Sequence, residues 1–105
     1  MRYQFLGRNC GLKVSELALG VALFGTAWGY GADAAQARLV FDRFVEAGGN
    51  FFDTSDSYQF GQSETLLGES AQSMRDDVVI ASKYSSGAAS DASLAKTGNS
   101  RNSMI

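Results

Sequence analysis

The sequence predicts an α/β fold in which a parallel sheet is covered by helices. Short apolar runs of the kind found in buried strands occur at residues 17–20 (LALG), 50–53 (NFFD) and 78–82 (VVIAS). Two segments with helical features lie between them, so the predicted order is strand, helix, strand, helix, strand. Successive βαβ units with short connections form parallel sheets that are buried by helices.

The first 15 residues predict a β-hairpin. Residues 2–6 (RYQFL) and 12–15 (LKVS) are short strand-like runs on either side of the glycine-bounded turn GRNCG. We expect this hairpin to cap the rest of the domain. Cys10 is the only cysteine, so it cannot form an internal disulfide, and we interpret it as a small turn residue. After the strand at 17–20, the glycine-spaced run VALFGTAWGYGA predicts a loop.

Residues 33–47 predict the first helix. Six positions share one helical face: Ala37, Val40, Phe41, Phe44, Val45 and Gly48. Asp33 and Gln36 fit a capping box, and Gly48 with Gly49 provides the C-terminal stop.

A second helix is predicted with Ser63 as its N-cap. Four later residues would share its buried face: Leu67, Ser70, Ala71 and Met74. Residues 85–105 carry six serines and little periodicity, so they predict a loop or disordered tail that enters a helix near residue 99 or 100. We interpret residues 1–105 as a single partial domain. Three parallel strands leave sheet edges unpaired, so we expect a larger architecture or self-association.

Composition excludes several classes of protein. The apolar share of 45% suits a packed core, and the formal charge of -2 comes without a basic cluster, so a nucleic-acid partner is not expected. The absence of histidine removes the commonest metal ligand and general base, and no metal site is predicted. No apolar tract reaches the roughly 20 residues of a membrane span, and no secretory leader is recognisable, so we expect a cytoplasmic protein.

Residues 29–34 (GYGADA) match the dinucleotide-binding pattern G-x-G-x-x-[GA], and Asp53 ends the next predicted strand. That motif needs a tight turn directly after its strand, whereas residues 21–28 intervene here. A Rossmann-type domain therefore stays as an alternative to an ordinary glycine-rich loop and helix cap.

Three chemically active side chains follow the predicted strands. Asp53 ends the second strand, Tyr58 lies in the loop after it, and Lys83 follows the third. The carboxyl ends of parallel strands share one rim, so we expect all three to face one pocket. The Lys83 ammonium would stabilise the phenolate form of Tyr58, and the Asp53 carboxylate would keep the ammonium charged and in place. A phenol in such surroundings can donate a proton to a carbonyl oxygen. From spacing alone we favour the simpler alternative, a rim ion pair with Tyr58 as an ordinary loop residue.

Four strings together resemble the N-terminal part of an aldo-keto reductase: LGRNCGLKVSELALG, FVEAGG, NFFDTSDSYQFGQSETLLG and VVIASK. They occur in the right order along nearly the whole chain, and the D-T-x-x-x-Y and S-E-x-x-L-G elements are the most specific. The resemblance implies an N-terminal hairpin plus the first three strands and two helices of a (β/α)8 TIM barrel. It also implies reduction of aldehydes or ketones with NADPH and without a metal.

The resemblance also assigns roles. Tyr58 matches the proton donor of the family, Lys83 the lysine that tunes it, and Asp53 the carboxylate that pairs with the lysine. Gly20 and Asp53 match positions near the nicotinamide end of NADP(H).

Phe24 and Trp28 lie on the loop where such proteins line the substrate pocket. Their alternative role is core or loop packing. Val21 stands where many members carry a threonine.

Other parts of the family pattern have no counterpart here. The remaining catalytic position is a histidine after the fourth strand, and most of the phosphate and adenosine site comes from the last strands. A barrel takes about 250 residues, so we expect a truncated form with little or no activity alone. A non-catalytic binding or self-assembly module, using the unpaired sheet edges, is the main alternative.

Overall fold

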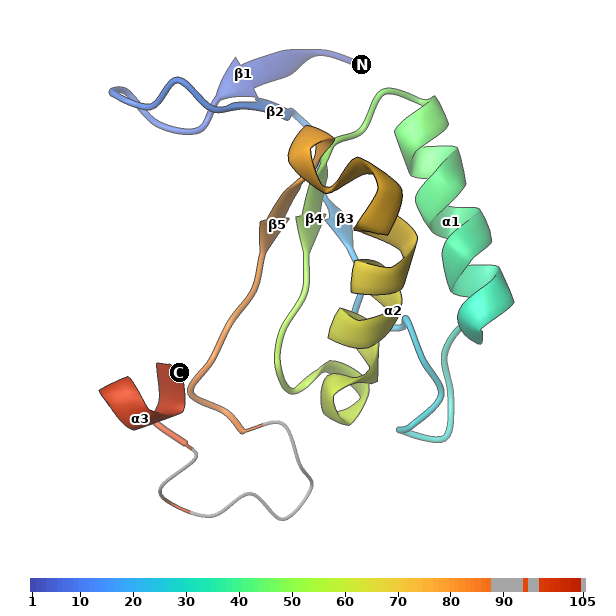
Figure 1. Cartoon of the computed structure of the whole chain (residues 1–105), viewed down its shortest axis with the longest axis vertical. Coiled ribbons are helices and arrows are strands. Elements are labelled where there is room, and N and C mark those ends of the chain that lie inside the picture. Colours follow the sequence, from blue (N-terminus) through green and yellow to red (C-terminus); the bar gives the residue numbers. More distant parts are fainter. Residues whose placement is uncertain (88–93, 95–96, 105) are drawn as a thin grey trace.

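The computed structural model describes residues 1–87, 94 and 97–104. It contains an antiparallel hairpin, a parallel sheet and two main helices, in the predicted alternating order (Figure 1). The strands are β1 (Tyr3–Phe5), β2 (Lys13–Ser15), β3 (Leu19–Gly20), β4 (Phe51–Asp53) and β5 (Val79–Ala81). The helices are α1 (Ala34–Glu46), α2 (Gln62–Ala71) and α3 (Arg101–Met104), with 3₁₀ segments η1 (Tyr58–Gly61) and η2 (Gln72–Asp77).

The hairpin lies across the amino end of the sheet, as Figure 1 shows, and Asn50 attaches it there. The Asn50 side-chain oxygen accepts a hydrogen bond from the Ser15 N–H at 2.7 Å, and its amide donates to the Lys13 carbonyl at 3.1 Å. The Tyr3 hydroxyl donates to the Gly48 carbonyl at 2.6 Å. The predicted hairpin is therefore present and joined to the residues just before β4.

Helix α1 begins with the predicted capping box, in which Asp33 and Gln36 each accept a hydrogen bond from the other's backbone N–H. Ala37 and Phe41 are buried, but Val40 is 42% exposed, so its predicted burial is wrong. The helix packs along a narrower stripe than the apolar pattern predicts, and Val40 lies on the flank of that stripe.

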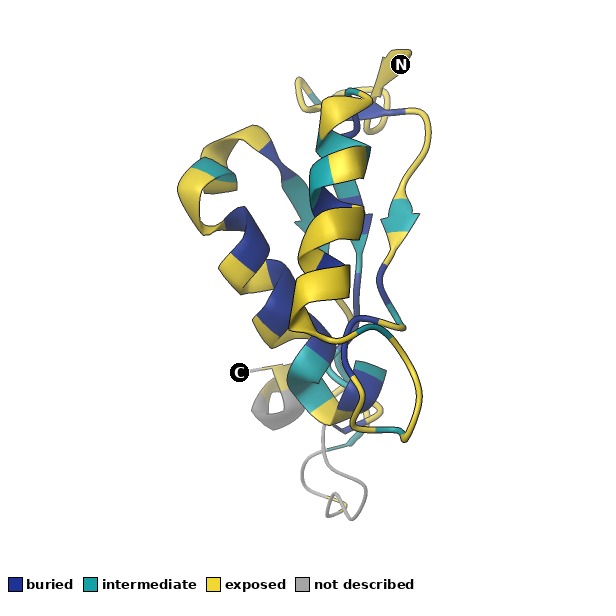
Figure 2. Cartoon of the chain, turned by 90° about the vertical axis from the view of Figure 1, so that its right-hand side faces the viewer, coloured by how far each residue is buried: buried dark blue, intermediate teal, exposed yellow. Residues whose placement is uncertain are grey.

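The core forms where side chains from paired positions on the three parallel strands pack against the helices. Leu19, Phe52 and Ile80 are paired across β3, β4 and β5, and the fully buried Phe52 stacks on Phe41 of α1 with ring centroids 4.8 Å apart. In Figure 2 the buried residues of both helices lie on their inner sides. Because neighbouring strand residues point to opposite faces, Asp53 lies on the face away from the helices.

Helix α2 corrects the prediction for Ser63. The N-cap is Gly61, and Ser63 lies inside the helix, where it is fully buried. It cannot serve as a cap because its hydroxyl is directed into the core and donates to the Val21 carbonyl at 2.7 Å. Leu67, Ser70 and Ala71 are buried on one face of the helix, as predicted. The helix ends at Ala71, however, so Met74 lies beyond it in η2, where it is partly buried against the core.

Part of the loop or tail predicted at 85–105 lies outside the described residues, namely 88–93, 95–96 and 105. Helix α3 begins at Arg101, close to the predicted helix start. Among the described residues, no helix is long and apolar enough to cross a membrane.

Candidate active site

The segments that directly follow β3, β4 and β5 extend beyond the carboxyl ends of the sheet, at the opposite end from the hairpin (Figure 1). Gly20, Asp53 and Ala81 pair across the last row of the sheet. Backbone hydrogen bonds continue past that row, since the Thr54 N–H donates to Ala81 and the Asp56 N–H to the Lys83 carbonyl. This extended pairing brings the residues after β5 beside the residues after β4.

The Lys83 ammonium joins the predicted site residues. It lies 3.1 and 2.9 Å from the two carboxylate oxygens of Asp53, 3.2 Å from the Tyr58 hydroxyl oxygen and 2.8 Å from the Thr54 carbonyl oxygen. It also lies 4.8 Å from the centroid of the Tyr58 ring. The structure therefore brings Asp53, Tyr58 and Lys83 together, as predicted from their places after the strands.

These contacts set the charge state of the lysine. Desolvation lowers the pKa of Lys83, but its hydrogen bonds to Asp53 and Tyr58 and the attraction of both groups outweigh that effect, so the pKa is raised above its ordinary value. The ammonium is thus held in its charged form beside the phenol. About half of the lysine side chain stays exposed, which leaves the group open to solvent and small molecules.

Tyr58 is presented by an unusual turn. The next two residues, Gln59 and Phe60, have φ values of 53° and 54°, in the left-handed region. That conformation costs a non-glycine residue about 1–2 kcal/mol, so the surrounding contacts must hold it. The result is that Gln59 is fully buried, while Phe60 is exposed and Tyr58 is half-buried at the rim.

A buried hydroxyl pair supports the strand end beneath this turn. The Thr54 and Ser63 hydroxyls lie 2.9 Å apart, and Ser63 also bonds to the Val21 carbonyl. These contacts connect the residues that follow β3 and β4 with the first turn of α2. Both hydroxyls are satisfied, as buried polar groups require.

Trp28 is the centre of an aromatic cluster that includes Tyr58. Trp28 lies 6.1 Å from Tyr30, 6.3 Å from Tyr58 and 6.4 Å from Phe60, measured between ring centroids. Phe24, by contrast, is only 4% exposed and packs in the core. Of the two predicted substrate-lining residues, the structure places Trp28 beside Tyr58 and buries Phe24 as a packing residue.

The glycine motif at 29–34 does not form a dinucleotide-binding turn. It lies at the far end of the loop 21–33 between β3 and α1, where Phe24 pairs with Ala32 in an isolated bridge. Gly31 has a φ of +133°. The helix therefore does not start directly after its strand, and the geometry that the Rossmann pattern needs is missing.

Sequence reasoning missed several residues that build the site. Thr54 supplies a carbonyl to Lys83, and the side chains of Gln59 and Gln62 hold the loop that carries Trp28. Each is an ordinary polar residue in a polar segment, and no spacing distinguishes it. Only the left-handed turn and the long-range contacts reveal these roles.

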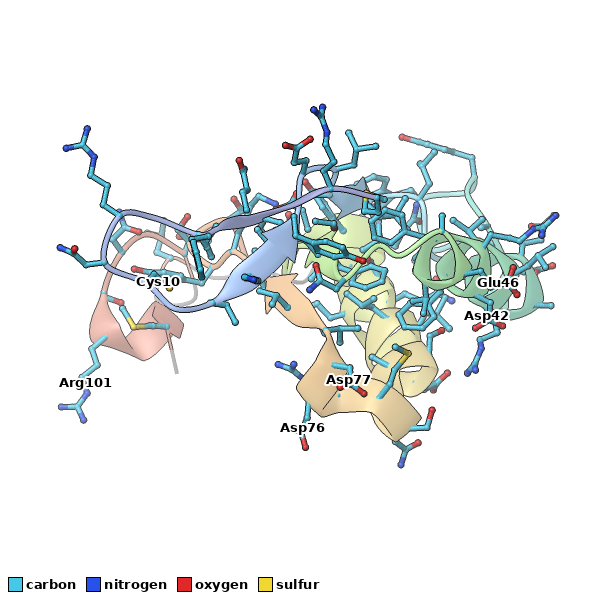
Figure 3. All side chains as sticks on the ribbon, turned by 90° about the horizontal axis from the view of Figure 1, so that it is seen from above. Cys10, Asp42, Glu46, Asp76, Asp77 and Arg101 are labelled. Atoms are coloured by element: carbon cyan, nitrogen blue, oxygen red, sulfur yellow. The ribbon has the colours of Figure 1, made fainter. Side chains whose placement is uncertain are left out.

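The cysteine and several acidic side chains lie on other elements of the fold. In Figure 3, Cys10 lies in the hairpin turn, Asp42 and Glu46 lie on α1, and Asp76 and Asp77 project from η2. Within the described part of the chain, no three Cys, Asp or Glu side chains gather closely enough to hold a metal ion.

Comparison with known proteins agrees with this geometry. The Aldo/keto reductase family model matches residues 16–105. Norsolorinic acid reductase B from Aspergillus parasiticus is 40% identical over 91 residues, covering 82% of this chain and 24% of that protein. Aryl-alcohol dehydrogenase [NADP(+)] from Phanerodontia chrysosporium is 41% identical over 90 residues, covering 80% of this chain and 23% of that protein.

A solved structure supports the same assignment. The holo form of an aldo-keto reductase from Bacillus halodurans superposes with a TM-score of 0.68 at 34% identity, over 78% of this chain and 25% of that one. The described strands and helices thus correspond to part of the fold of that aldo-keto reductase. The chain belongs to the aldo/keto reductase family. It spans about a quarter of the length of these relatives.

Proposed function

We propose that Asp53, Tyr58 and Lys83 form the proton-donating part of an NADPH-dependent oxidoreductase that reduces aldehydes or ketones to alcohols. The observation that carries the proposal is the Lys83 ammonium, which contacts both the Tyr58 hydroxyl and the Asp53 carboxylate. Membership of the aldo/keto reductase family supports the reaction class. Relatives named as a reductase and as an NADP(+)-linked alcohol dehydrogenase support interconversion of a carbonyl compound and an alcohol with an NADP cofactor.

In this proposal Tyr58 donates its phenolic proton to the carbonyl oxygen of the substrate, where negative charge develops. Lys83 donates a hydrogen bond to the phenol oxygen and stabilises the negative charge that the departing proton leaves there. Asp53 and the Thr54 carbonyl hold the ammonium in that position. The substrate gains a C–H bond and an O–H bond and becomes an alcohol.

The residues present fit the nicotinamide end of a cofactor. Gly20 lies opposite Asp53 in the sheet, is exposed, and has no atom within 4 Å of the place where a Cβ would be. A side chain there would cover surface next to the Asp53 carboxylate, whereas glycine leaves it open to a flat ring. We propose that Gly20 and Asp53 bind this end of NADPH, which supplies the hydride when bound.

The test is Tyr58→Phe in the protein that carries this sequence, with NADPH consumption measured against an aromatic aldehyde. Loss of a general acid predicts a fall in kcat of about 100-fold or more with little change in KM. Tyr3→Phe removes a hydroxyl from the hairpin at the opposite end of the sheet and is the matched control. A Tyr58→Phe variant whose kcat stays within about fivefold of the parent would refute the assigned role.

We further propose that residues 1–105 alone are inactive and bind NADPH weakly or not at all, because the relatives are about four times as long as their matched portions. Trp28 is the only tryptophan, so its fluorescence reports on the site. Titration of residues 1–105 with NADPH should give no saturable quenching at micromolar concentrations. Saturable quenching would contradict this part of the proposal.

A further inference from the structure

Gln59, the residue after the proposed proton donor, bridges to the loop that carries the aromatic cluster. Its side-chain oxygen accepts a hydrogen bond from the backbone N–H of Trp28 at 2.8 Å, and its amide nitrogen donates to the backbone carbonyls of Ala22 at 3.2 Å and Tyr30 at 3.1 Å. Both N–H donors and the oxygen therefore have partners. The reversed amide would place donors against the Trp28 N–H, so the partners select one orientation.

The backbone conformation at this point serves that bridge. With Gln59 and Phe60 both in the left-handed region, the chain directs the Gln59 side chain into the interior while Phe60 stays exposed. Non-glycine residues keep such a conformation only where their surroundings determine it. The fully buried amide and its three hydrogen bonds are the contacts that do so.

The bridged loop packs tightly against the amide. A Cβ on Gly31 would lie 3.0 Å from the Gln59 amide nitrogen and 2.0 Å from a backbone carbonyl oxygen of the same loop. Gln62 adds a second attachment, since its side-chain oxygen accepts from the N–H groups of Thr26 and Ala27. Residues on both sides of Trp28 are thus held by side chains from the Tyr58 turn and the start of α2.

We propose that Gln59 is a positioning residue that holds Trp28 against the Tyr58 ring and so fixes one wall of the space where substrate meets the proton donor. The edge-on contact between Trp28 and Tyr58 is the geometry that the bridge maintains. The consequence for turnover rests on the proposed function. The placement of Trp28 does not rest on the proposed function, because hydrogen bonds within the chain determine where Trp28 lies.

The first test measures Trp28 directly. Gln59→Met keeps the size of the side chain and removes the three hydrogen bonds, and Gln59→Gly removes them while relieving the left-handed strain. Both variants should raise the acrylamide quenching constant of Trp28 by about twofold or more, because an indole released from its packing becomes accessible. Gln72→Met, at an exposed position in η2, is the matched control and should match the parent.

Circular dichroism establishes whether each variant is folded. If Gln59→Met does not fold, the quenching constant of Gln59→Gly provides the test. An unchanged quenching constant in a folded Gln59 variant overturns the proposal. A change in Gln59→Met that Gln59→Gly lacks also overturns it, because strain would then be the cause.

The second test separates this inference from the proposed function. In the active protein, Gln59→Met should raise KM for an aromatic aldehyde about 2- to 12-fold, the worth of one aromatic contact, and change kcat less. In a Trp28→Leu background the same substitution should have no further effect on KM, whereas additive effects would contradict an action through Trp28. If Tyr58→Phe stays active, the proposed function fails while the quenching result still decides the role of Gln59.

Discussion

Replacing Lys83 by methionine separates its role in stability from its role in chemistry. The substitution keeps an unbranched side chain and removes the ammonium, with its contacts to Asp53, Tyr58 and the Thr54 carbonyl. The side chains of the ion pair are 48% and 42% exposed, and such pairs contribute at most about 1 kcal/mol. The free energy of unfolding should therefore fall by no more than about 1 kcal/mol, as measured by urea denaturation.

The expected effect on turnover is larger. Under the proposed function, Lys83→Met removes a charged hydrogen-bond donor from the phenol oxygen as negative charge develops on it. A hydrogen bond to a charged group is worth about 1.5–3 kcal/mol. At about 1.4 kcal/mol per tenfold in rate, kcat should fall by about 10- to 150-fold.

The assay is steady-state NADPH consumption by the protein that carries this sequence, with Lys13→Met as the control. Lys13 lies in the hairpin, with its ammonium 5.4 Å from the centroid of the Phe5 ring and away from the site. A folded Lys83→Met variant with kcat within about threefold of the parent would refute the reasoning.

The raised pKa of Lys83 predicts the sign of its pH dependence. A folded-state pKa above the unfolded value means that the folded protein holds the proton more tightly, so the stabilisation is fully present below the unfolded pKa of about 10.4. It is lost as pH rises through the folded pKa. The difference in unfolding free energy between the parent and Lys83→Met should be constant at neutral pH and shrink in this alkaline range. A difference that grows there would contradict the assigned charge state.

Three further predictions concern the packing that positions the site, each measured by urea denaturation. Phe52→Ala should lower the free energy of unfolding by about 3–5 kcal/mol because the ring is fully buried, whereas Phe5→Ala, at an exposed hairpin position, should have a small effect. Ser63→Ala should cost about 1–3 kcal/mol, since it removes a buried hydrogen bond to the Val21 carbonyl and leaves the buried Thr54 hydroxyl without its Ser63 partner. Gly31→Ala should destabilise more than Gly29→Ala, because its Cβ would lie 2.0 Å from a carbonyl oxygen while Gly29 has open space; equal effects would contradict the close packing of the loop.

The first helix shows which structural features can be predicted from residues that are close together in the sequence. Asp33 and Gln36 determine its start through contacts between neighbours in the sequence, and these are predictable because they involve one turn of helix. The burial of Val40 was predicted wrongly, because the width of a buried stripe depends on what packs against it.

The second helix shows a feature that local sequence cannot predict, namely the role of Ser63. Ser63 has the residue type and the place of an N-cap, yet its hydroxyl bonds to Val21, far away in the sequence. A cap and a buried core hydroxyl use the same chemistry, so the residue type alone cannot distinguish them.

The sequence by itself determined the alternating order of strands and helices and the placement of Asp53, Tyr58 and Lys83 after strands. These follow from periodicity and from the rule that parallel strands end at one rim. Only the tertiary structure decided which buried polar groups form hydrogen bonds with one another. The left-handed turn at Gln59, its bridge to Trp28 and the burial of Phe24 depend on contacts between the loops after β3 and β4. Such long-range contacts form only when the sheet has aligned those loops, and no local pattern encodes them.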